Sequence, residues 1–420
     1  MRSIVTVGGA VFIILGLVAT GAAQTPVTYS ACVLKDGTLR MVSQSQSCKN
    51  NETRISWNSV GPQGPPGPPG QSDPVNVTVH CGGGQTVGAA LAQGASRSGQ
   101  LTITIEGTCI ESVTIRRDDV TLVGASPTDG LQAPDATSNP LQVTSAQRVT
   151  LSGLHLQGGS QNSGLIVRHG AAVSAFNLSV VGASWGIGVD GAVFECGECT
   201  VEGNLIGVGV NLGSRVSLWH STVRNNGHHG VFANGGSVLL NNTTVEGNAG
   251  AGVMGWTDGQ IGVEASTIQG NTQGGISLQQ ATVQVDQDSF ITGNSQSGIG
   301  LWFGARANLR HVTIEDNDVG ITAYGGSVVL FGGDSQTTAT IIRGNHGDGV
   351  QLNDTSVAGA GSTTGVLITG NAQHGVFCAP APAVAQITTA GGPSNYSLNA
   401  SNVLGNTVAP QISCPGFVVQ

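Results

Sequence analysis

The feature that most constrains the fold is a five-residue phrase that recurs through the middle of the chain. Its first copy, Thr-Val-Glu-Gly-Asn, ends at Asn204, and later copies end in an asparagine at intervals of 22 or 23 residues as far as Asn317. A unit this short cannot bury its own apolar face, whereas stacked copies bury it against one another. The period therefore predicts a solenoid.

Each repeat reads as three short strands joined by turns. A Thr-Val strand leads to Gly-Asn, a polar loop, a second strand that opens with Gly-Val or Gly-Ile, a turn and a third strand. This pattern leaves no room for a helix, and it lacks the Leu-x-x-Leu-x-Leu signature of a leucine-rich repeat, whose period is similar. We therefore predict an all-β fold, a parallel β-helix whose turns lie about 4.8 Å apart.

The recurring asparagines are predicted to stack at one corner of the coil. Asparagine tolerates left-handed backbone geometry, and its amide can bond to the turns above and below. The predicted ladder comprises Asn204, Asn226, Asn248, Asn271, Asn294, Asn317, Asn345 and Asn371. We expect the repeats to span residues 75–378, with a short helix over residues 86–95 capping the first turn and a C-terminal cap over residues 379–420.

The repeat resembles a known group of folds. Gly247-Asn248, followed after three residues by Gly252-Val253, resembles the generic Asn-rich repeats of right-handed parallel β-helix proteins in the pectate-lyase-like superfamily. The resemblance covers residues 75–420 and implies that fold. It implies no single function, because the superfamily includes polysaccharide lyases, hydrolases, epimerases, adhesins and proteins without known activity.

Three segments precede the repeats. Residues 1–23 read as an export signal, with Arg2 before an apolar run and small residues near the end; a retained membrane anchor is the alternative. Residues 24–60 read as a small Cys-containing module, in which Asp36-Gly37 predicts the turn of a β-hairpin. Residues 61–74 contain Gly-x-y triplets, resemble the collagen-like linkers of bacterial exported proteins and predict a semi-rigid Gly-Pro-Pro spacer, with trimerisation as the alternative.

The eight cysteines fit an oxidising destination, so we expect a secreted or cell-surface protein. Neighbourhood in the sequence pairs Cys32 with Cys48, Cys81 with Cys109, and Cys378 with Cys414. Cys196 and Cys199 form either a local disulfide or two free thiols at a turn. No second ligand pair stands at zinc spacing, so we expect no metal site.

Charge excludes one class of partner. The net charge is −9 and no basic stripe is present, so we expect no nucleic-acid partner, and no membrane contact once the signal is removed.

Because the repeats stack, residues at equal spacing in the sequence form columns along the coil. One of these columns contains residue types that suit carbohydrate binding. Counting seven or eight residues beyond the corner asparagines gives Asn211, Asn234, Trp256, Gln279, Trp302, Tyr324 and Asn353. We expect Asn234, Trp256, Gln279, Trp302 and Tyr324 to be the ligand-binding residues of this column. Trp256 and Trp302 are expected two turns, or about 10 Å, apart. Aromatic faces beside amides suit sugar rings, which present apolar C–H faces and hydroxyl edges. The alternative is that these side chains only cover a turn.

A second column could carry catalysis. Glu264 and Asp286 are expected on adjacent turns about 5 Å apart, where they could share a proton or hold Ca²⁺. Arg310, on the next turn, could neutralise a uronate or act as a base in a polysaccharide lyase; a solvated charge cluster is the alternative.

Gly227-His228-His229-Gly230 resembles the Gly-His-Gly of polygalacturonases but lacks that family's Asn-Thr-Asp partner, so we interpret it as a polar loop.

These observations favour an exported β-helix that binds polysaccharide through the aromatic and amide column. The alternatives are a lyase acting on polyuronide and a purely structural surface protein. Without catalysis we expect no cofactor, and Ca²⁺ would be needed only by a lyase.

Overall fold

The computed structural model describes residues 27–58, 74–95, 99–211, 213–332, 340–360, 366–379, 386–389 and 403–414. The predicted export signal and the Gly-Pro-Pro run lie outside these residues. The chain divides into two compact units, residues 1–69 and residues 70–420. No helix of the described residues is long and apolar enough to cross a membrane.

The described part of the first unit is a three-stranded antiparallel sheet of order β2-β1-β3. Its strands are β1 (Thr28–Leu34), β2 (Leu39–Val42) and β3 (Glu52–Asn58). The turn between β1 and β2 contains Gly37 at φ 86°, a left-handed position that glycine adopts without strain, as expected from Asp36-Gly37. The predicted disulfide between Cys32 and Cys48 joins β1 to the loop before β3.

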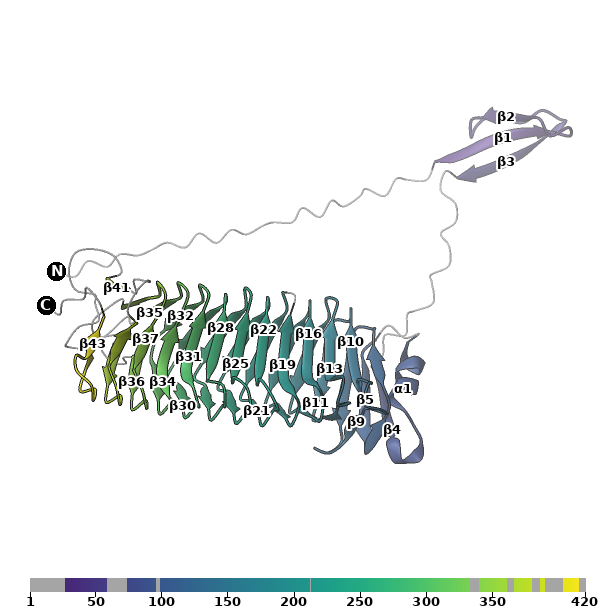
Figure 1. Cartoon of the computed structure of the whole chain (residues 1–420). Helices are drawn as coiled ribbons and strands as arrows, with labels where there is room; N and C mark the ends of the chain where they lie inside the picture. Colours follow the sequence, from purple (N-terminus) through teal and green to yellow (C-terminus); the bar gives the residue numbers. More distant parts are fainter. Residues whose placement is uncertain are drawn as a thin grey trace, which may run out of the picture. The chain divides into compact units, whose positions relative to one another are not determined.

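The second unit is a right-handed parallel β-helix of about 12 turns. Its described residues form three long parallel sheets, which we name sheets 1, 2 and 3 (Figure 1). In a typical turn the chain passes from sheet 3 through the asparagine corner to sheet 2, then to sheet 1, and back to sheet 3. The predicted fold class is confirmed.

Sheet 1 has 14 strands among the described residues. They are β4 (Val75–His80), β5 (Leu101–Glu106), β8 (Val120–Gly124), β11 (Val149–Ser152), β14 (Ala172–Phe176), β17 (Val193–Gly197), β20 (Arg215–Trp219), β23 (Ser237–Asn241), β26 (Gln260–Glu264), β29 (Thr282–Asp286), β32 (Arg306–Leu309), β35 (Val328–Phe331), β38 (Val357–Ala360) and β41 (Gln386–Thr389).

Sheet 2 has 13 strands within the described ranges. They are β7 (Val113–Ile115), β10 (Leu141–Thr144), β13 (Ser163–Arg168), β16 (Trp185–Asp190), β19 (Ile206–Asn211), β22 (Val231–Asn234), β25 (Val253–Trp256), β28 (Ile276–Gln279), β31 (Ser297–Trp302), β34 (Val319–Ala323), β37 (Val350–Leu352), β40 (Val376–Cys378) and β43 (Ile412–Ser413).

Sheet 3 likewise has 13 strands in the part of the chain that the structure describes. They are β6 (Thr108–Ile110), β9 (Gly130–Gln132), β12 (His155–Gln157), β15 (Ser179–Val181), β18 (Thr200–Glu202), β21 (Thr222–Arg224), β24 (Thr244–Glu246), β27 (Thr267–Gln269), β30 (Ser289–Thr292), β33 (Val312–Glu315), β36 (Thr340–Arg343), β39 (Val366–Thr369) and β42 (Val403–Leu404).

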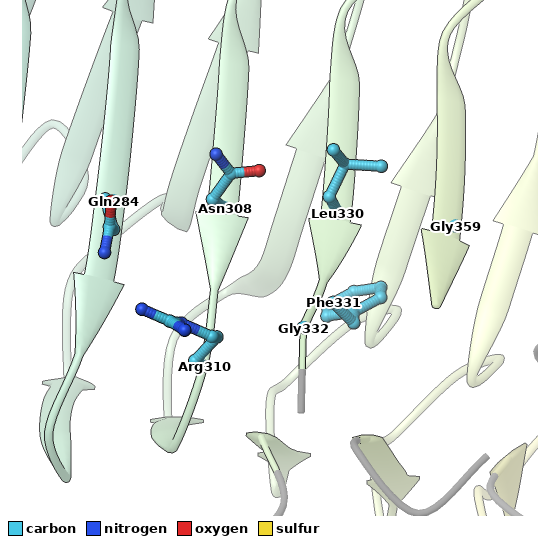
Figure 2. Close-up of a pocket in the computed structure, with 7 residues that line it drawn as sticks. All are labelled: Gln284, Asn308, Arg310, Leu330, Phe331, Gly332 and Gly359. Atoms are coloured by element: carbon cyan, nitrogen blue, oxygen red, sulfur yellow. The ribbon is translucent and has the colours of Figure 1, made fainter. Parts of the chain in front are cut away.

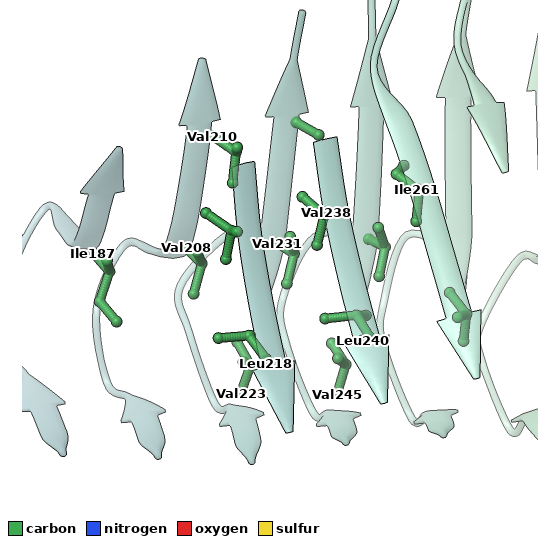
Figure 3. Close-up of a cluster of buried hydrophobic side chains, with 14 of the residues drawn as sticks. Ile187, Val208, Val210, Leu218, Val223, Val231, Val238, Leu240, Val245 and Ile261 are labelled. Atoms are coloured by element: carbon green, nitrogen blue, oxygen red, sulfur yellow. The ribbon is translucent and has the colours of Figure 1, made fainter. Parts of the chain in front are cut away.

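The interior of the coil is filled by columns of branched aliphatic side chains. In sheet 3, Val201 pairs with Val223, which pairs with Val245, and each is at most 1% exposed. Figure 3 shows the same stacking where side chains of all three sheets meet. Burying one such side chain stabilises the fold by about 1.5–3 kcal/mol. Identical or similar residues therefore recur at each level because the cross-section repeats.

The asparagine ladder runs along the corner between sheets 3 and 2. The side chain of Asn248 donates to Oδ1 of Asn271 at 2.9 Å, and the Asn248 N–H donates to the same oxygen at 3.1 Å. Equivalent amide-to-amide bonds join every neighbouring pair from Asn204 to Asn371. The ladder asparagines are between 0% and 3% exposed, so these bonds are shielded from water.

One detail of the predicted corner is wrong. The ladder asparagines do not adopt the left-handed backbone themselves; the residue before each one does, as with Gly247 at φ 60°, Asn225 at φ 52° and Asp316 at φ 56°. The glycine of the Gly-Asn phrase therefore turns the chain, and the turn directs the asparagine side chain into the coil.

The coil continues beyond the predicted boundary at residue 378. Asn406 extends the ladder, accepting from the side chain of Asn371 at 2.8 Å, and β42 and β43 pair with β39 and β40. The interval of 35 residues before Asn406 hid this turn because it contains a long insertion. The predicted disulfide between Cys378 and Cys414 joins the end of β40 to the residue after β43.

The N-terminal end of the coil is closed by the expected helix. Helix α1 (Val87–Gly94) contacts β4, β5 and β7, and it follows the short 3-10 helix η1 (Cys81–Gly83) (Figure 1). Thr86 caps α1 by accepting from the Ala89 N–H at 3.2 Å, and the Glu111 carboxylate accepts from the Val87 N–H at 2.7 Å. These bonds satisfy helix-end amides that have no partner within the helix. The predicted Cys81–Cys109 disulfide ties η1 to β6.

Candidate functional site

The predicted aromatic and amide column lies at the carboxyl ends of the sheet 2 strands. Asn234 pairs with Trp256, Trp256 with Gln279, and Gln279 with Trp302. Tyr324 follows β34, and its N–H donates to the Leu301 carbonyl at 2.8 Å, which places it one turn beyond Trp302. The five predicted residues therefore share one edge of the coil.

The two tryptophans of this column differ in exposure. Trp256 is 45% exposed, whereas Trp302 is half-buried. The Trp302 ring folds back over Gly300, where an added Cβ would overlap it. Glycine at position 300 thus provides the space that the Trp302 indole occupies.

Further rings extend this column across the outer face of sheet 2. Phe232 packs edge-on against Trp256 with centroids 6.3 Å apart, and against Trp185 at 6.0 Å. His229 stacks on Phe232 at 6.0 Å with an interplanar angle of 11°. We name Trp185, His229, Phe232, Trp256 and Trp302 the aromatic surface. Trp185 and Phe232 were missed from the sequence, although Phe232 lies two positions before Asn234 and alternation along β22 places both outward.

The histidine of this surface is held neutral. Its Nδ1 accepts a hydrogen bond from the Ala251 N–H at 3.1 Å, so the proton of the neutral ring lies on Nε2. Burial, and secondarily repulsion from His228, lowers the pKa of His229 from 6.5 to about 4. At neutral pH, His229 therefore presents an uncharged ring. The interpretation of Gly227-His228-His229-Gly230 as only a polar loop is incomplete, because His229 packs within the aromatic surface.

The predicted catalytic column lies on sheet 1. Glu264 pairs with Asp286, and the Arg310 N–H donates to the Val285 carbonyl, which places Arg310 on the next turn. The Arg310 guanidinium lies 2.7 Å from the Asp286 carboxylate. Glu264 accepts a hydrogen bond from Asn241 Nδ2 at 3.0 Å. The three predicted residues are neighbours, but Asp286 is engaged by Arg310 rather than left to act with Glu264.

Two shallow depressions adjoin this column. One, of about 300 Å³, is lined by Gln284, Asn308, Arg310, Leu330, Phe331, Gly332 and Gly359 (Figure 2). The other, of about 420 Å³, has Glu264 in its wall and shares Gln284 and Asn308 with the first. Gln284, Asn308 and Leu330 occupy successive turns of one outward column. Sheet 1 therefore presents a hollowed strip with amides at its centre, not a flat face.

This strip offers little for acid–base or metal chemistry. The Arg310 guanidinium is engaged by the Asp286 carboxylate at 2.7 Å, which leaves it less available to act as a base. Within the described residues, the only group of three or more potential metal ligands close enough to share an ion is Cys32, Cys48 and Glu52, whose two sulfurs form a disulfide. Among the described residues, Glu264 and Asp286 thus lack a third carboxylate or histidine with which to share a Ca²⁺ ion.

The fourth cysteine pair also has a simple structural role. Cys196 and Cys199 form a disulfide across the turn from β17 to β18, and both are buried. Of the two alternatives for this pair, the structure shows the local disulfide.

The fold places the chain among the right-handed parallel β-helix proteins. Residues 206–290 match the family model described as "Right handed beta helix region". A search of curated proteins found no match. The assignment to this class rests on the strand pairing described above.

Several solved structures resemble the chain. One is the A-module of the mannuronan C-5 epimerase AlgE6 of Azotobacter vinelandii, with 16% identity, 78% of this chain and 93% of that chain covered, and a TM-score of 0.46. Another is DFA-IIIase of Arthrobacter chlorophenolicus, at 8% identity, 75% and 93% coverage, and a TM-score of 0.42. A third is the pectate lyase Pel9A, at 12% identity, 73% and 74% coverage, and a TM-score of 0.28.

Proposed function

We propose that this chain is an exported protein that binds an extracellular polysaccharide on the aromatic surface of sheet 2. The observation that carries the proposal is the exposed indole of Trp256, held by edge-on packing against Phe232 and in register with Gln279 and Trp302. Sugar rings bind through apolar C–H faces and hydroxyl edges, which aromatic rings and amides respectively complement.

The repeat of the coil suits a repeating ligand. Trp256 and Trp302 stand two turns apart, roughly 10 Å, with the Gln279 amide between them. Because Phe232 packs against the Trp256 indole, little freedom of this side chain is lost when a sugar binds. Neutral His229 adds a polar ring without adding positive charge.

Export is part of the proposal. The four disulfides involve all eight cysteines, which fits an oxidising compartment. The first 23 residues read as an export signal in the sequence. We therefore place the protein outside the cytoplasm, secreted or at the cell surface.

A lyase acting on sheet 1 is the second candidate function, because the Glu264 and Arg310 side chains border the two depressions. It is less well supported, since Asp286 engages the Arg310 guanidinium, and among the described residues no third carboxylate or histidine joins Glu264 and Asp286 in a Ca²⁺ site. A purely structural role is the third candidate, and it makes no use of the exposed Trp256.

The test is affinity electrophoresis of the exported chain through gels containing neutral or anionic polysaccharides. We expect retardation by at least one polysaccharide and roughly tenfold weaker binding of Trp256→Ala, the loss of about 1.4 kcal/mol of stacking. The matched control is Phe290→Ala, which removes a ring that is 44% exposed on sheet 3.

Three results separate the candidates. Equal weakening by Trp256→Ala and Phe290→Ala would contradict the proposed surface. Release of unsaturated uronides, followed by ultraviolet absorbance and lost in Arg310→Ala, would establish the lyase instead. No retardation by any polysaccharide would leave the structural role as the better account.

A further inference from the structure

The small N-terminal sheet has one apolar face and one polar face. The pairing register of the three strands shows which residues share a face, because residues directly opposite each other in antiparallel strands point to the same side. Ala31 is opposite both Met41 and Ile55, Val33 is opposite Leu39, and Tyr29 is opposite Trp57. Thr53, opposite Val33 in β3, also lies on this side; the seven apolar residues, which we name the apolar face, carry no charge.

The charged residues of the sheet lie on the opposite side. Arg40 forms an ion pair with Glu52 at 2.6 Å, and Arg54 donates to the Gln44 carbonyl at 2.8 Å. The loop that contains Gln44 also carries Cys48, whose disulfide joins it to Cys32 on this polar side. That side is thus covered by the chain's own loop.

The apolar face has no such cover among the described residues. Leu39 is 56% exposed, Met41 57%, Ile55 41%, Trp57 44% and Tyr29 41%. Buried hydrophobic residues of the sheet are limited to Ala31, Cys32 and Val42 in the described part of this unit. The Cys32–Cys48 disulfide stabilises this small sheet, but its apolar face stays open to water, and an exposed apolar face of this kind marks a surface that binds a partner.

The sequence that follows β3 indicates how many copies of the chain associate through this face. Glycine recurs at every third position, at 61, 64, 67 and 70, with prolines between. A single-chain spacer has no need of this period, whereas three chains wound round a common axis require glycine at every third place. Three triplets are too few to hold three chains together alone, and the apolar face of the strands that precede them in the sequence can supply the missing attraction.

We propose that the chain is a homotrimer in which three copies pack the apolar faces of their β1–β3 sheets against one another. The threefold arrangement buries Met41, Ile55 and Trp57 of each copy around one axis and leaves Arg40 and Arg54 on the outside. This inference does not depend on polysaccharide binding, because it rests on the first unit alone.

The test is the mass of the full chain, recovered after export, by light scattering and sedimentation equilibrium at micromolar concentration. We expect three times the chain mass. Met41→Lys with Ile55→Lys puts two charges in the centre of the apolar face, and we expect this variant to be a monomer. The matched control, Ser45→Lys with Ser56→Lys, adds the same two charges at exposed positions off the apolar face, and we expect it to remain trimeric.

Two further measurements keep the result interpretable. Formation of the Cys32–Cys48 disulfide, read by peptide mass without reduction, shows whether each variant module has folded. Gly64→Ala with Gly67→Ala leaves the sheet intact and should weaken the trimer at least tenfold. A monomeric or dimeric wild-type chain would overturn the proposal, as would a trimer that survives the two lysines on the apolar face.

Discussion

The ladder makes a quantitative prediction at Asn271, which is 0% exposed at the middle of the corner. Its Oδ1 accepts from the Asn248 N–H at 3.1 Å and from Asn248 Nδ2 at 2.9 Å. Its Nδ2 donates to the Val245 carbonyl at 3.2 Å and to Asn294 Oδ1 at 3.0 Å. Asn271→Ala removes these four bonds without water to replace them.

The four losses are unequal. The Asn248 N–H is left unsatisfied, at a cost of about 2 kcal/mol, and the Val245 carbonyl loses a bond worth about 1 kcal/mol. The two amide-to-amide bonds cost about 0.5 kcal/mol each, because Asn248 Nδ2 still reaches the Val223 carbonyl and Asn294 Oδ1 still accepts from the Asn271 N–H. We therefore expect Asn271→Ala to lower the free energy of unfolding by about 4 kcal/mol.

Urea denaturation followed by circular dichroism measures this change. The matched control is Gln273→Ala, two residues further on in the exposed loop, which should change stability by less than about 0.5 kcal/mol. The transition of Asn271→Ala should also broaden, because a solenoid weakened at one level unfolds in parts. A loss below about 1 kcal/mol would refute the view that the ladder stabilises the corner.

The remaining predictions concern pH and disulfides. Because the pKa of His229 falls from 6.5 to about 4 on folding, the unfolded chain binds more protons between these values, so the melting temperature should fall as pH drops through this window and fall less in His229→Gln. A melting profile identical in the two proteins would contradict this. Replacing Cys378 and Cys414 by alanine opens a separation of 36 residues and should cost about 4 kcal/mol, against about 2 kcal/mol for Cys196 and Cys199, separated by 3. A larger fall in the urea midpoint on removing Cys196 and Cys199 than on removing Cys378 and Cys414 would show that loop length does not determine how much each disulfide stabilises the fold.

Much of the coil was predictable because its cross-section repeats. Once the asparagines set the period, counting from them placed Trp256, Gln279 and Trp302 in one column, and the strand pairing has the same register. The same count placed Glu264 beside Asp286. A parallel coil converts distance along the sequence directly into position on a face, which few other folds do.

Features that depend on side-chain rotation were not predictable in this way. The period puts Arg310 above Asp286, but only the structure shows that the guanidinium engages that carboxylate. The contact between Phe232 and Trp185 needs the space above Gly209, over which the Trp185 ring lies. Asn406 was not assigned to the ladder, because the gap of 35 residues after Asn371 was interpreted as the end of the coil. An insertion lengthens this turn without interrupting the ladder.

The apolar face of the first unit was missed for a related reason. The hairpin turn at Asp36-Gly37 was predicted, but the third strand and its register were not. Without β3, the pairing of Tyr29 with Trp57 and of Ala31 with Ile55 has no basis in the sequence.

The most direct test of the proposed function is a crystal structure of the chain with an oligosaccharide of the polysaccharide that it binds best. The account predicts sugar rings stacked on Trp256 and Trp302, with a hydroxyl bonded to the Gln279 amide between them. Sugar density over Gln284 and Asn308 in the depressions of sheet 1, with the aromatic surface empty, would contradict it.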